Sequence, residues 1–162
     1  GAFIWIPSIL VDAGFDLEGG DAADVRPGAA VVSPGELPVL GIDDVLDQAR
    51  TGLLLDARAG ERFRGEVEPI DPRAGHIPGA VSAPTTQNND ESGRFRCSDE
   101  LRERFAALGA EPGATVGVYC GSGVSAAHEA IALSLAGYRP VLYPGSWSQW
   151  SQHPDRPIAT GA

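Results

Sequence analysis

Cys120 is the residue of this sequence best suited to nucleophilic chemistry. It lies in "VYCGSGVSAAHEA", residues 118–130, between an apolar run and a segment of helical character. Gly121 and Gly123 allow backbone conformations that other residues resist, so successive N–H groups can point inward and bind an anion. A helix that starts near Ser125 adds partial positive charge. These donors favour the nucleophilic thiolate; the alternative is a buried, inert thiol.

The residue six positions after Cys120 argues against phosphate chemistry. Phosphatases and arsenate reductases with a loop of this kind carry an arginine there, which closes around the phosphate. This sequence has Ala126 instead. The remaining donors are backbone N–H groups, which suit a persulfide anion or a bound oxyanion.

The other reactive side chains do not have the spacing of a metal site. Cys97 and Cys120 form no CxxC pair, and His76, His128 and His153 are scattered. We therefore expect no metal and no cofactor. Both cysteines are interpreted as free thiols, with a disulfide between them under oxidation as the alternative. His76 suits fixing the turn in "GHIPGA", and His128 suits packing or solvent exposure.

Strand-like and helix-like segments alternate along residues 42–143, which indicates an α/β fold with a parallel sheet covered by helices on both faces. The predicted strands are 53–57, 80–84, 114–119 and 139–143, and the predicted helices are 42–50, 98–108 and 125–136. Ligands of such sheets bind at the carboxyl ends of the strands. Cys120 directly follows one of these ends.

Details of the helices and of the C-terminal segment can also be predicted. Ser98 is expected to cap the second helix, and Gly137 to follow the end of the third. Apolar side chains share one face of the third helix, and two tryptophans are expected to pack the C-terminal segment against the sheet. These residues are Ala127, Ile131, Leu135, Trp147 and Trp150.

Length and charge limit the classes of partner. The chain has 162 residues, of which 43% are hydrophobic, enough for one main domain. Its 12 basic and 22 acidic residues give a formal charge of −10, which would repel nucleic acids and anionic membranes. No run approaches the roughly 20 apolar residues that span a bilayer, and "GAFIWIPSIL" lacks the features of a signal peptide. We expect a cytoplasmic protein with no nucleic-acid or membrane partner.

The loop "CGSGVSA" resembles the active-site loop of the rhodanese superfamily, in the form found in 3-mercaptopyruvate sulfurtransferases. The stretches "LLDARAGERFRGEVEPIDPRAGHIPGAVSAPTT" and "LYPGSWSQWSQHPDRPIATG" are similar to the rest of the catalytic, C-terminal domain of two-domain sulfurtransferases. The resemblance implies a rhodanese-like domain at 37–162, a linker at 19–36 and, at 1–18, the tail of an upstream rhodanese-like domain. That upstream domain would be a partner within the same protein.

The resemblance also implies a reaction. Cys120 would take a sulfur atom from a donor, hold it as a persulfide and pass it to a thiol or to cyanide. Gly121, Gly123, Val124 and Ser125 would form the anion-binding loop around it. A thiolate is the nucleophile that such a displacement needs.

Further residues gain roles from the same resemblance. Arg62 matches the arginine that binds the substrate anion, and Asp56 and Arg58 match a charge pair that supports the loop. Ser122 matches a serine that assists proton movement. A second substrate arginine has no counterpart in register in "EVEPIDPRAG", and Arg73 is the candidate to replace it, ahead of Arg64.

The choice of donor follows from the residues after the cysteine. Members that prefer thiosulfate carry basic residues at the positions that Gly121 and Ser122 occupy here. The sequence therefore favours 3-mercaptopyruvate as donor. Two alternatives stay open, which are thiosulfate:cyanide transfer and a persulfide carrier or binding module without efficient turnover of small molecules.

Overall fold

The structure of the protein is a computed structural model that describes residues 14, 16 and 38–162. Gly35–Ala162 form one compact unit. A separate unit, Gly1–Pro34, lies almost entirely outside the described residues. The segments 1–18 and 19–36 belong to that region, so the upstream tail and the linker remain predictions.

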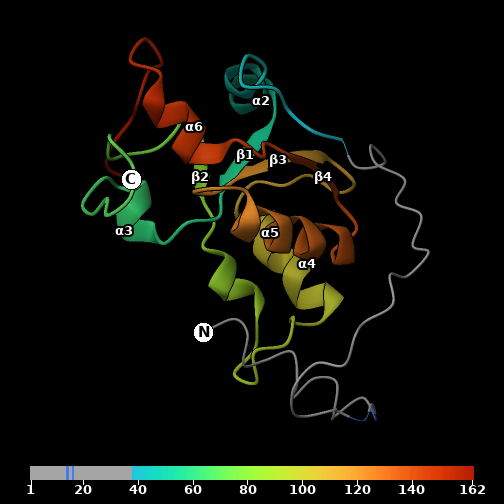
Figure 1. Cartoon of the computed structure of the whole chain (residues 1–162). Helices are drawn as coiled ribbons and strands as arrows, with labels where there is room; N and C mark the ends of the chain where they lie inside the picture. The colour runs from blue at the N-terminus through green and yellow to red at the C-terminus, as the bar shows by residue number, and fades with distance from the viewer. Residues whose placement is uncertain (1–13, 15, 17–37) are drawn as a thin grey trace, which may run out of the picture. The chain divides into compact units, whose positions relative to one another are not determined.

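A four-stranded parallel sheet lies at the centre of the described unit (Figure 1). Its order is β2-β1-β3-β4. The strands are β1 (Leu53–Asp56), β2 (Val81–Ser82), β3 (Thr115–Tyr119) and β4 (Arg139–Leu142). Each predicted strand is present and is shorter by one to three residues. The predicted α/β class and parallel sheet are confirmed.

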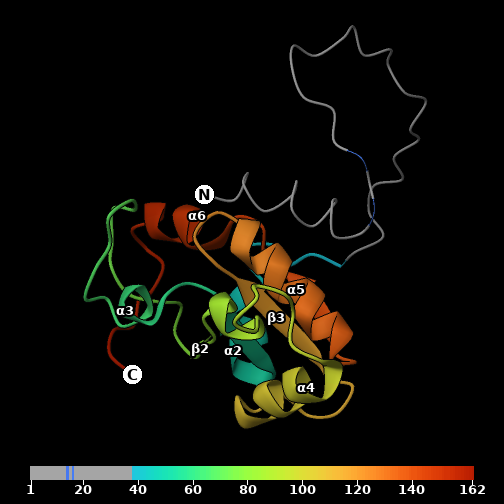
Figure 2. The ribbon, with the colours of Figure 1, turned by 90° about the horizontal axis from the view of Figure 1, so that it is seen from below.

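Helices cover both faces of this sheet, as Figures 1 and 2 show. Successive residues of β1 point to opposite faces, and Leu54 and Leu55 accordingly belong to different core clusters. The Leu55 cluster contains side chains of α4 (Ser98–Ala107) and α5 (Val124–Leu135). The Leu54 cluster contains side chains of α2 (Val45–Thr51) and α6 (Ser146–Gln152). Trp147 and Trp150 of α6 are fully buried there, as predicted.

Two predicted helix starts are wrong. The N-cap of α4 is Cys97 and not Ser98, and the N–H of Cys97 donates to Oε2 of Glu100 at 3.1 Å. The N-cap of α5 is Gly123, so this helix begins at Val124 rather than at Ser125. The pattern of side chains could not locate either start to the residue, because the apolar periodicity is the same for both alternatives.

Three short helical segments were not predicted. They are α3 (Gly60–Phe63), the 3-10 helix η2 (Thr85–Asn88) and α6. With four to seven residues each, they are too short to show a helical period. His76 holds α3, because its Nδ1 lies 2.8 Å from the carbonyl oxygen of Phe63 and the two rings stack at 3.7 Å.

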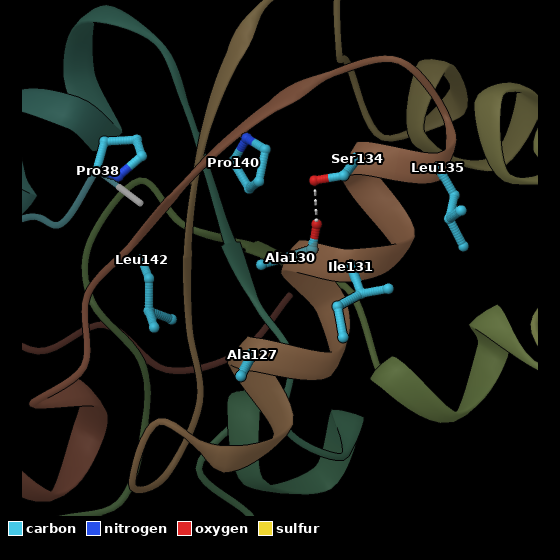
Figure 3. A pocket seen from close by; sticks show the side chains of 8 residues that line it. All are labelled: Pro38, Ala127, Ala130, Ile131, Ser134, Leu135, Pro140 and Leu142. Carbon is cyan, nitrogen blue, oxygen red and sulfur yellow. Dashed lines mark hydrogen bonds between the residues drawn. The ribbon is translucent and has the colours of Figure 1, made fainter. Parts of the chain in front are cut away.

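The face of α5 that carries Ala127, Ile131 and Leu135 is not the face packed on the sheet. Ala126, Glu129, Ala132 and Leu133 are buried instead. Ala127, Ile131 and Leu135 line an apolar groove of about 420 Å³ between α5 and the edge strand β4 (Figure 3). Within residues 38–162, no helix has both the length and the apolar character needed to cross a membrane.

Candidate active site

The candidate site lies where β1 and β3 end side by side. Asp56 is opposite Tyr119 in the register of the two strands, and the N–H of Ala57 donates to the carbonyl oxygen of Tyr119 at 2.8 Å. The chain leaves β1 toward β2 on one side and leaves β3 toward β4 on the other. The loops after β1 and β3 therefore diverge, and a crevice forms between them, which is where parallel sheets bind ligands.

A cavity of about 280 Å³ opens at this crevice. Its lining includes most of the residues that the sequence predicted for the site, together with Ala59, Ile70, Asp71 and Ser148. The predicted residues in the lining are Arg58, Arg62, Cys120, Gly121, Ser122 and Ser125. Two larger cavities in the described part of the chain contain no cysteine in their linings. The chemistry of Cys120 therefore belongs to the smaller cavity.

The thiol of Cys120 lies in a backbone environment that can stabilise a thiolate. The residue is 2% exposed, and its Sγ accepts a hydrogen bond from the N–H of Gly123 at 3.1 Å. The loop continues directly into α5, whose first N–H groups have no partners within the helix. Both the hydrogen bond and the N-terminus of α5 stabilise a negatively charged sulfur at this position.

The start of α6 holds the other side of the cysteine loop. The N–H of Cys120 donates to Oγ of Ser146 at 3.1 Å, and Ser146 in turn donates to the carbonyl oxygen of Tyr143. The N–H groups of Trp147 and Ser148 donate to the carbonyl oxygens of Cys120 and Gly121, both at 2.9 Å. This anchor was not predicted, because the α6 segment shows no helical period.

Gly123 is required by the geometry of the loop. Its φ is +87°, a left-handed conformation that side chains disfavour, and a Cβ would lie 2.9 Å from the carbonyl oxygen of Pro144. The same residue supplies the N–H that contacts the sulfur of Cys120. The conformation of one glycine therefore sets the position of a hydrogen-bond donor to the nucleophile.

Asp56 and Arg58 form a buried charge pair beneath the cavity. Nη2 of Arg58 lies 2.6 Å from Oδ2 of Asp56, and the same nitrogen donates to the carbonyl oxygen of Gly75. Burial lowers the pKa of Arg58, but the hydrogen bond and charge of Asp56 outweigh it and the pKa is raised. The guanidinium also lies 4.6 Å from the ring of Trp147. These contacts keep Arg58 charged and fixed.

Arg62 reaches the cavity from α3 and is held by two carboxylates. Its Nη2 donates to Oε1 of Glu68 at 2.6 Å and to Oδ2 of Asp71 at 3.2 Å. Burial raises the pKa of Glu68, but hydrogen bonds from Arg62 and from the N–H groups of Asp71 and Ile70 bring it below the ordinary value. Glu68 is therefore ionised. Neither acid was predicted, although both stand in the same "EVEPIDPRAG" stretch as Arg73.

The structure does not bring Arg73 to the cavity. Its guanidinium donates to backbone carbonyl oxygens of the C-terminal segment, namely those of Trp150, Ser151, His153 and Arg156. Arg64, the second candidate, is exposed and pairs with Glu66 at 2.8 Å. The expected second substrate arginine is therefore absent from the lining of this cavity.

The remaining reactive side chains take structural positions. Cys97 is exposed, Cys120 is buried, and both are free thiols. His128 stacks on Phe95 at 4.4 Å, and its Nδ1 lies 2.8 Å from Oγ1 of Thr85. Over residues 38–162, no group of three or more His, Cys, Asp or Glu side chains could hold a metal ion.

The sequence is similar to a known domain family and to curated sulfurtransferases. Residues 42–153 match the family model described as rhodanese-like domain. A probable 3-mercaptopyruvate sulfurtransferase of Pseudomonas aeruginosa is 50% identical over 155 residues, which are 92% of this chain and 54% of that protein. A putative thiosulfate sulfurtransferase, SseB of Mycobacterium tuberculosis, is 50% identical over 108 residues, which are 67% of this chain and 38% of that protein.

Solved structures share the fold as well. One is a variant of EanB in which ergothioneine is covalently linked with a cysteine persulfide. It matches with a TM-score of 0.78 and 25% identity, over 94% of this chain and 39% of that one. The chain spans about half the length of the first curated relative, and less of the other two proteins.

Proposed function

The chain belongs to the family of rhodanese-like domains, and from this premise we propose that it is a sulfurtransferase whose nucleophile is Cys120. The observation that carries the proposal is the position of the sulfur. Sγ of Cys120 lies at the switch point of the sheet and accepts the N–H of Gly123, in a cavity lined by Arg58 and Arg62. A buried structural cysteine needs neither the cavity nor the cations.

In the first half of the reaction, the Cys120 thiolate attacks the sulfur of 3-mercaptopyruvate. An S–S bond forms and the C–S bond of the donor breaks, with its electron pair leaving on carbon. The carbon fragment departs as the enolate of pyruvate and takes up a proton. The enzyme retains the sulfur atom as a persulfide on Cys120, which the loop N–H groups stabilise as an anion.

In the second half, a thiolate or cyanide attacks the outer sulfur of the persulfide. A bond forms between the acceptor and that sulfur, and the S–S bond to Cys120 breaks. The electron pair of this bond returns to Cys120, which is a thiolate again. The protein is unchanged over the cycle, and no electrons are needed from outside.

Side chains around the cavity have distinct roles in this proposal. Arg62 binds the carboxylate of the donor through Nη1, which faces the cysteine loop while Glu68 and Asp71 hold Nη2. Asp56 and Arg58 are positioning residues, because they fix the end of β1 beside the cysteine loop. Ser122 lines the cavity and is proposed to assist the proton transfer to the enolate.

The choice of 3-mercaptopyruvate is supported by the relative from Pseudomonas aeruginosa, which carries that name, and by the non-basic residues Gly121 and Ser122. The name of the Mycobacterium tuberculosis relative favours thiosulfate as the second candidate. For a longer protein that includes an upstream domain, we propose that this domain supplies a proton donor next to Ser122. The lining of the cavity in the described residues includes no histidine.

A steady-state assay with two donors tests the function. The protein is mixed with 3-mercaptopyruvate or thiosulfate and with cyanide, and thiocyanate is measured. We expect turnover with 3-mercaptopyruvate to exceed turnover with thiosulfate, and both to vanish in Cys120→Ser. Faster turnover with thiosulfate would establish the second candidate. Thiocyanate formation that survives Cys120→Ser would refute the proposal.

A further inference from the structure

The charged side chains in the wall of the cavity and directly behind it carry more negative than positive charge when they are counted together. Three carboxylates, of Asp56, Glu68 and Asp71, contact two guanidinium groups, of Arg58 and Arg62. The side chains of the three acids are at most 5% exposed, and no other cation lines the cavity in the described part of the chain. The group as a whole has one net negative charge, close to the point where an anionic donor must bind.

Glu68 links the two arginines within this group. Its Oε1 accepts from Nη2 of Arg62 at 2.6 Å, and its Oε2 accepts from Nη1 of Arg58 at 3.3 Å. The N–H groups of Ile70 and Asp71 also donate to Oε1, both at 3.2 Å. One carboxylate therefore fixes both guanidinium groups and the loop that follows it.

Asp71 differs from Glu68 because it lines the cavity itself. Its Oδ2 shares the Nη2 group of Arg62 with Glu68. The two acids thus occupy one edge of the guanidinium. Nε of Arg62 is buried without a partner among the described residues, and Nη1 lies toward the cysteine loop, 3.4 Å from where a Cβ on Gly121 would stand.

Ile70 gives the rim of the cavity an apolar character. It is 74% exposed although it lines the cavity together with Cys120 and Arg62. An exposed isoleucine at the entrance adds apolar contact for a donor with a carbon skeleton and offers no charge to a second anionic group. Both the charge and the apolar character of the entrance therefore favour a donor with a carbon skeleton and a single negative charge.

We propose that Glu68 and Asp71 are positioning and specificity-determining residues, which hold Arg62 against the cysteine loop and offset its charge so that the site favours singly charged, carbon-bound sulfur donors over dianions. This inference rests on the proposed sulfurtransferase function. A dianion such as thiosulfate brings one more negative charge than 3-mercaptopyruvate to a group of five charged side chains that already sums to one net negative charge. The acids therefore lower the use of thiosulfate more than the use of 3-mercaptopyruvate.

Neutralising Asp71 tests the inference. Asp71→Asn keeps an oxygen that can accept from Arg62 but removes the charge. The rate of persulfide formation on Cys120 is measured with each donor. We expect the ratio of the thiosulfate rate to the 3-mercaptopyruvate rate to rise about tenfold, because one charge is removed at short range. A merely structural role would lower both rates and leave the ratio unchanged, and that result would overturn the inference.

Two further variants make the outcome independent of any loss of folding in Asp71→Asn. Ile70→Lys adds a positive charge at the exposed rim and should raise the same ratio. Glu66→Gln is the matched control, because Glu66 is an exposed acid of the same stretch whose partner is Arg64. This control removes one negative charge outside the cavity and should leave the ratio within about twofold of the unsubstituted protein. An equal rise in Glu66→Gln would contradict the role of the cavity wall.

Alkylation of Cys120 separates failure of this inference from failure of the proposed function. Iodoacetate is an anion and iodoacetamide is neutral, and both react with a thiolate without any sulfur transfer. Asp71→Asn should raise the rate with iodoacetate relative to iodoacetamide. If no donor yields a persulfide, the proposed function fails and the donor preference with it, while the alkylation ratio still shows whether Asp71 repels anions. An unchanged alkylation ratio overturns the charge argument in either case.

Discussion

The hydrogen-bond partners of Cys120 are backbone and hydroxyl groups rather than charged side chains. Gly123 donates to the sulfur, and Oγ of Ser146 accepts the N–H of Cys120. Arg58 and Arg62 line the same cavity, but they donate to carboxylates and to the backbone carbonyl oxygen of Gly75. The loop can therefore stabilise a negative sulfur in both the thiolate and the persulfide state, and Nη1 of Arg62 faces the loop for contact with the donor.

The first prediction concerns Gly123. Gly123→Ala should slow persulfide formation on Cys120 strongly, because the Cβ meets the carbonyl oxygen of Pro144 and displaces the N–H that contacts the sulfur. The strained φ alone should lower the free energy of unfolding by about 1–2 kcal/mol. Both effects are measured together, by the rate of persulfide formation and by denaturant unfolding.

Gly137→Ala is the control for that prediction. Gly137 has nearly the same φ, +86°, but a Cβ there has no atom within 4 Å. This variant should lose a similar amount of stability and keep the rate of persulfide formation. Equal rates in the two variants would show that Gly123 serves the turn and not the nucleophile.

At the scale of elements, α5 connects the site to the interior through Glu129. The side chain is fully buried, and it accepts from Nδ2 of Asn88 in η2 at 2.7 Å and from Nη1 of Arg104 in α4 at 3.2 Å. These contacts fix the helix that begins at the cysteine loop against two neighbouring elements. This buried carboxylate, with one cationic and one amide partner, holds the position of α5 at a cost in desolvation.

The second prediction follows from the pKa of Glu129. Burial raises this pKa above the ordinary 4.5, and Arg104 offsets only part of the effect. Between 4.5 and the raised value, the folded state binds the proton more tightly than the unfolded state, so stability falls as pH rises. The Tm of the protein minus that of Glu129→Gln should therefore decrease as pH rises above 4.5, as thermal scans at several pH values will show.

Glu100 provides the opposite case as a control. Hydrogen bonds to Cys97 lower the pKa of this exposed acid below 4.5. Its stabilising contribution is present above 4.5 and is lost as pH falls through the lowered value. The Tm of the protein minus that of Glu100→Gln should therefore be constant above 4.5. A parallel pH dependence of the two differences would contradict the assignment to Glu129.

The elements were predictable where apolar residues repeat over a sufficient length. The strands around Leu55 and Val118 and the helices α4 and α5 follow from periodicity and from Gly137 at a helix end. Helix starts at Cys97 and Gly123 were missed by one or two residues, because capping depends on backbone geometry. The short segments α3 and α6 carry Arg62 and the loop anchor Ser146, and no local pattern reveals them.

The site residues that could be predicted from the sequence are those that closely follow the end of a strand. Cys120 and Arg58 fall into this class, since each follows a recognisable strand. Arg73 was predicted to bind substrate only as the replacement for an arginine that has no counterpart in register. In the fold it binds the C-terminal segment instead. Glu68 and Asp71 were missed because their importance comes from contacts with Arg62, which only the folded chain brings together.

At the scale of the whole molecule, the charge of the chain opposes its proposed substrates. The formal charge is −10, whereas both candidate donors are anions. The local cations must therefore act against a repulsive long-range field. This field is screened by salt over about 10 Å at 0.1 M ionic strength, while contacts within the cavity are screened much less.

The third prediction concerns ionic strength. The kcat/KM for 3-mercaptopyruvate should rise by up to about twofold between roughly 0.01 and 0.15 M salt, because screening weakens the repulsion. The increase should be larger for the dianion thiosulfate. Alkylation by the neutral iodoacetamide serves as the control and should not depend on salt. A steep fall of kcat/KM with salt would show that attraction by Arg62 dominates the approach of the donor.

The central claim is that Cys120 carries the transferred sulfur, and its most direct test is the mass of the protein after reaction with a donor. The protein is incubated with 3-mercaptopyruvate, its intact mass is recorded, and the modified residue is located by peptide mapping. Cys97→Ser, which removes the exposed thiol, should gain one sulfur atom as the unsubstituted protein does, whereas Cys120→Ser should gain none. Addition of cyanide should then remove the sulfur and release thiocyanate. No added sulfur on Cys120 with either donor, or sulfur found on Cys97 instead, would contradict the account.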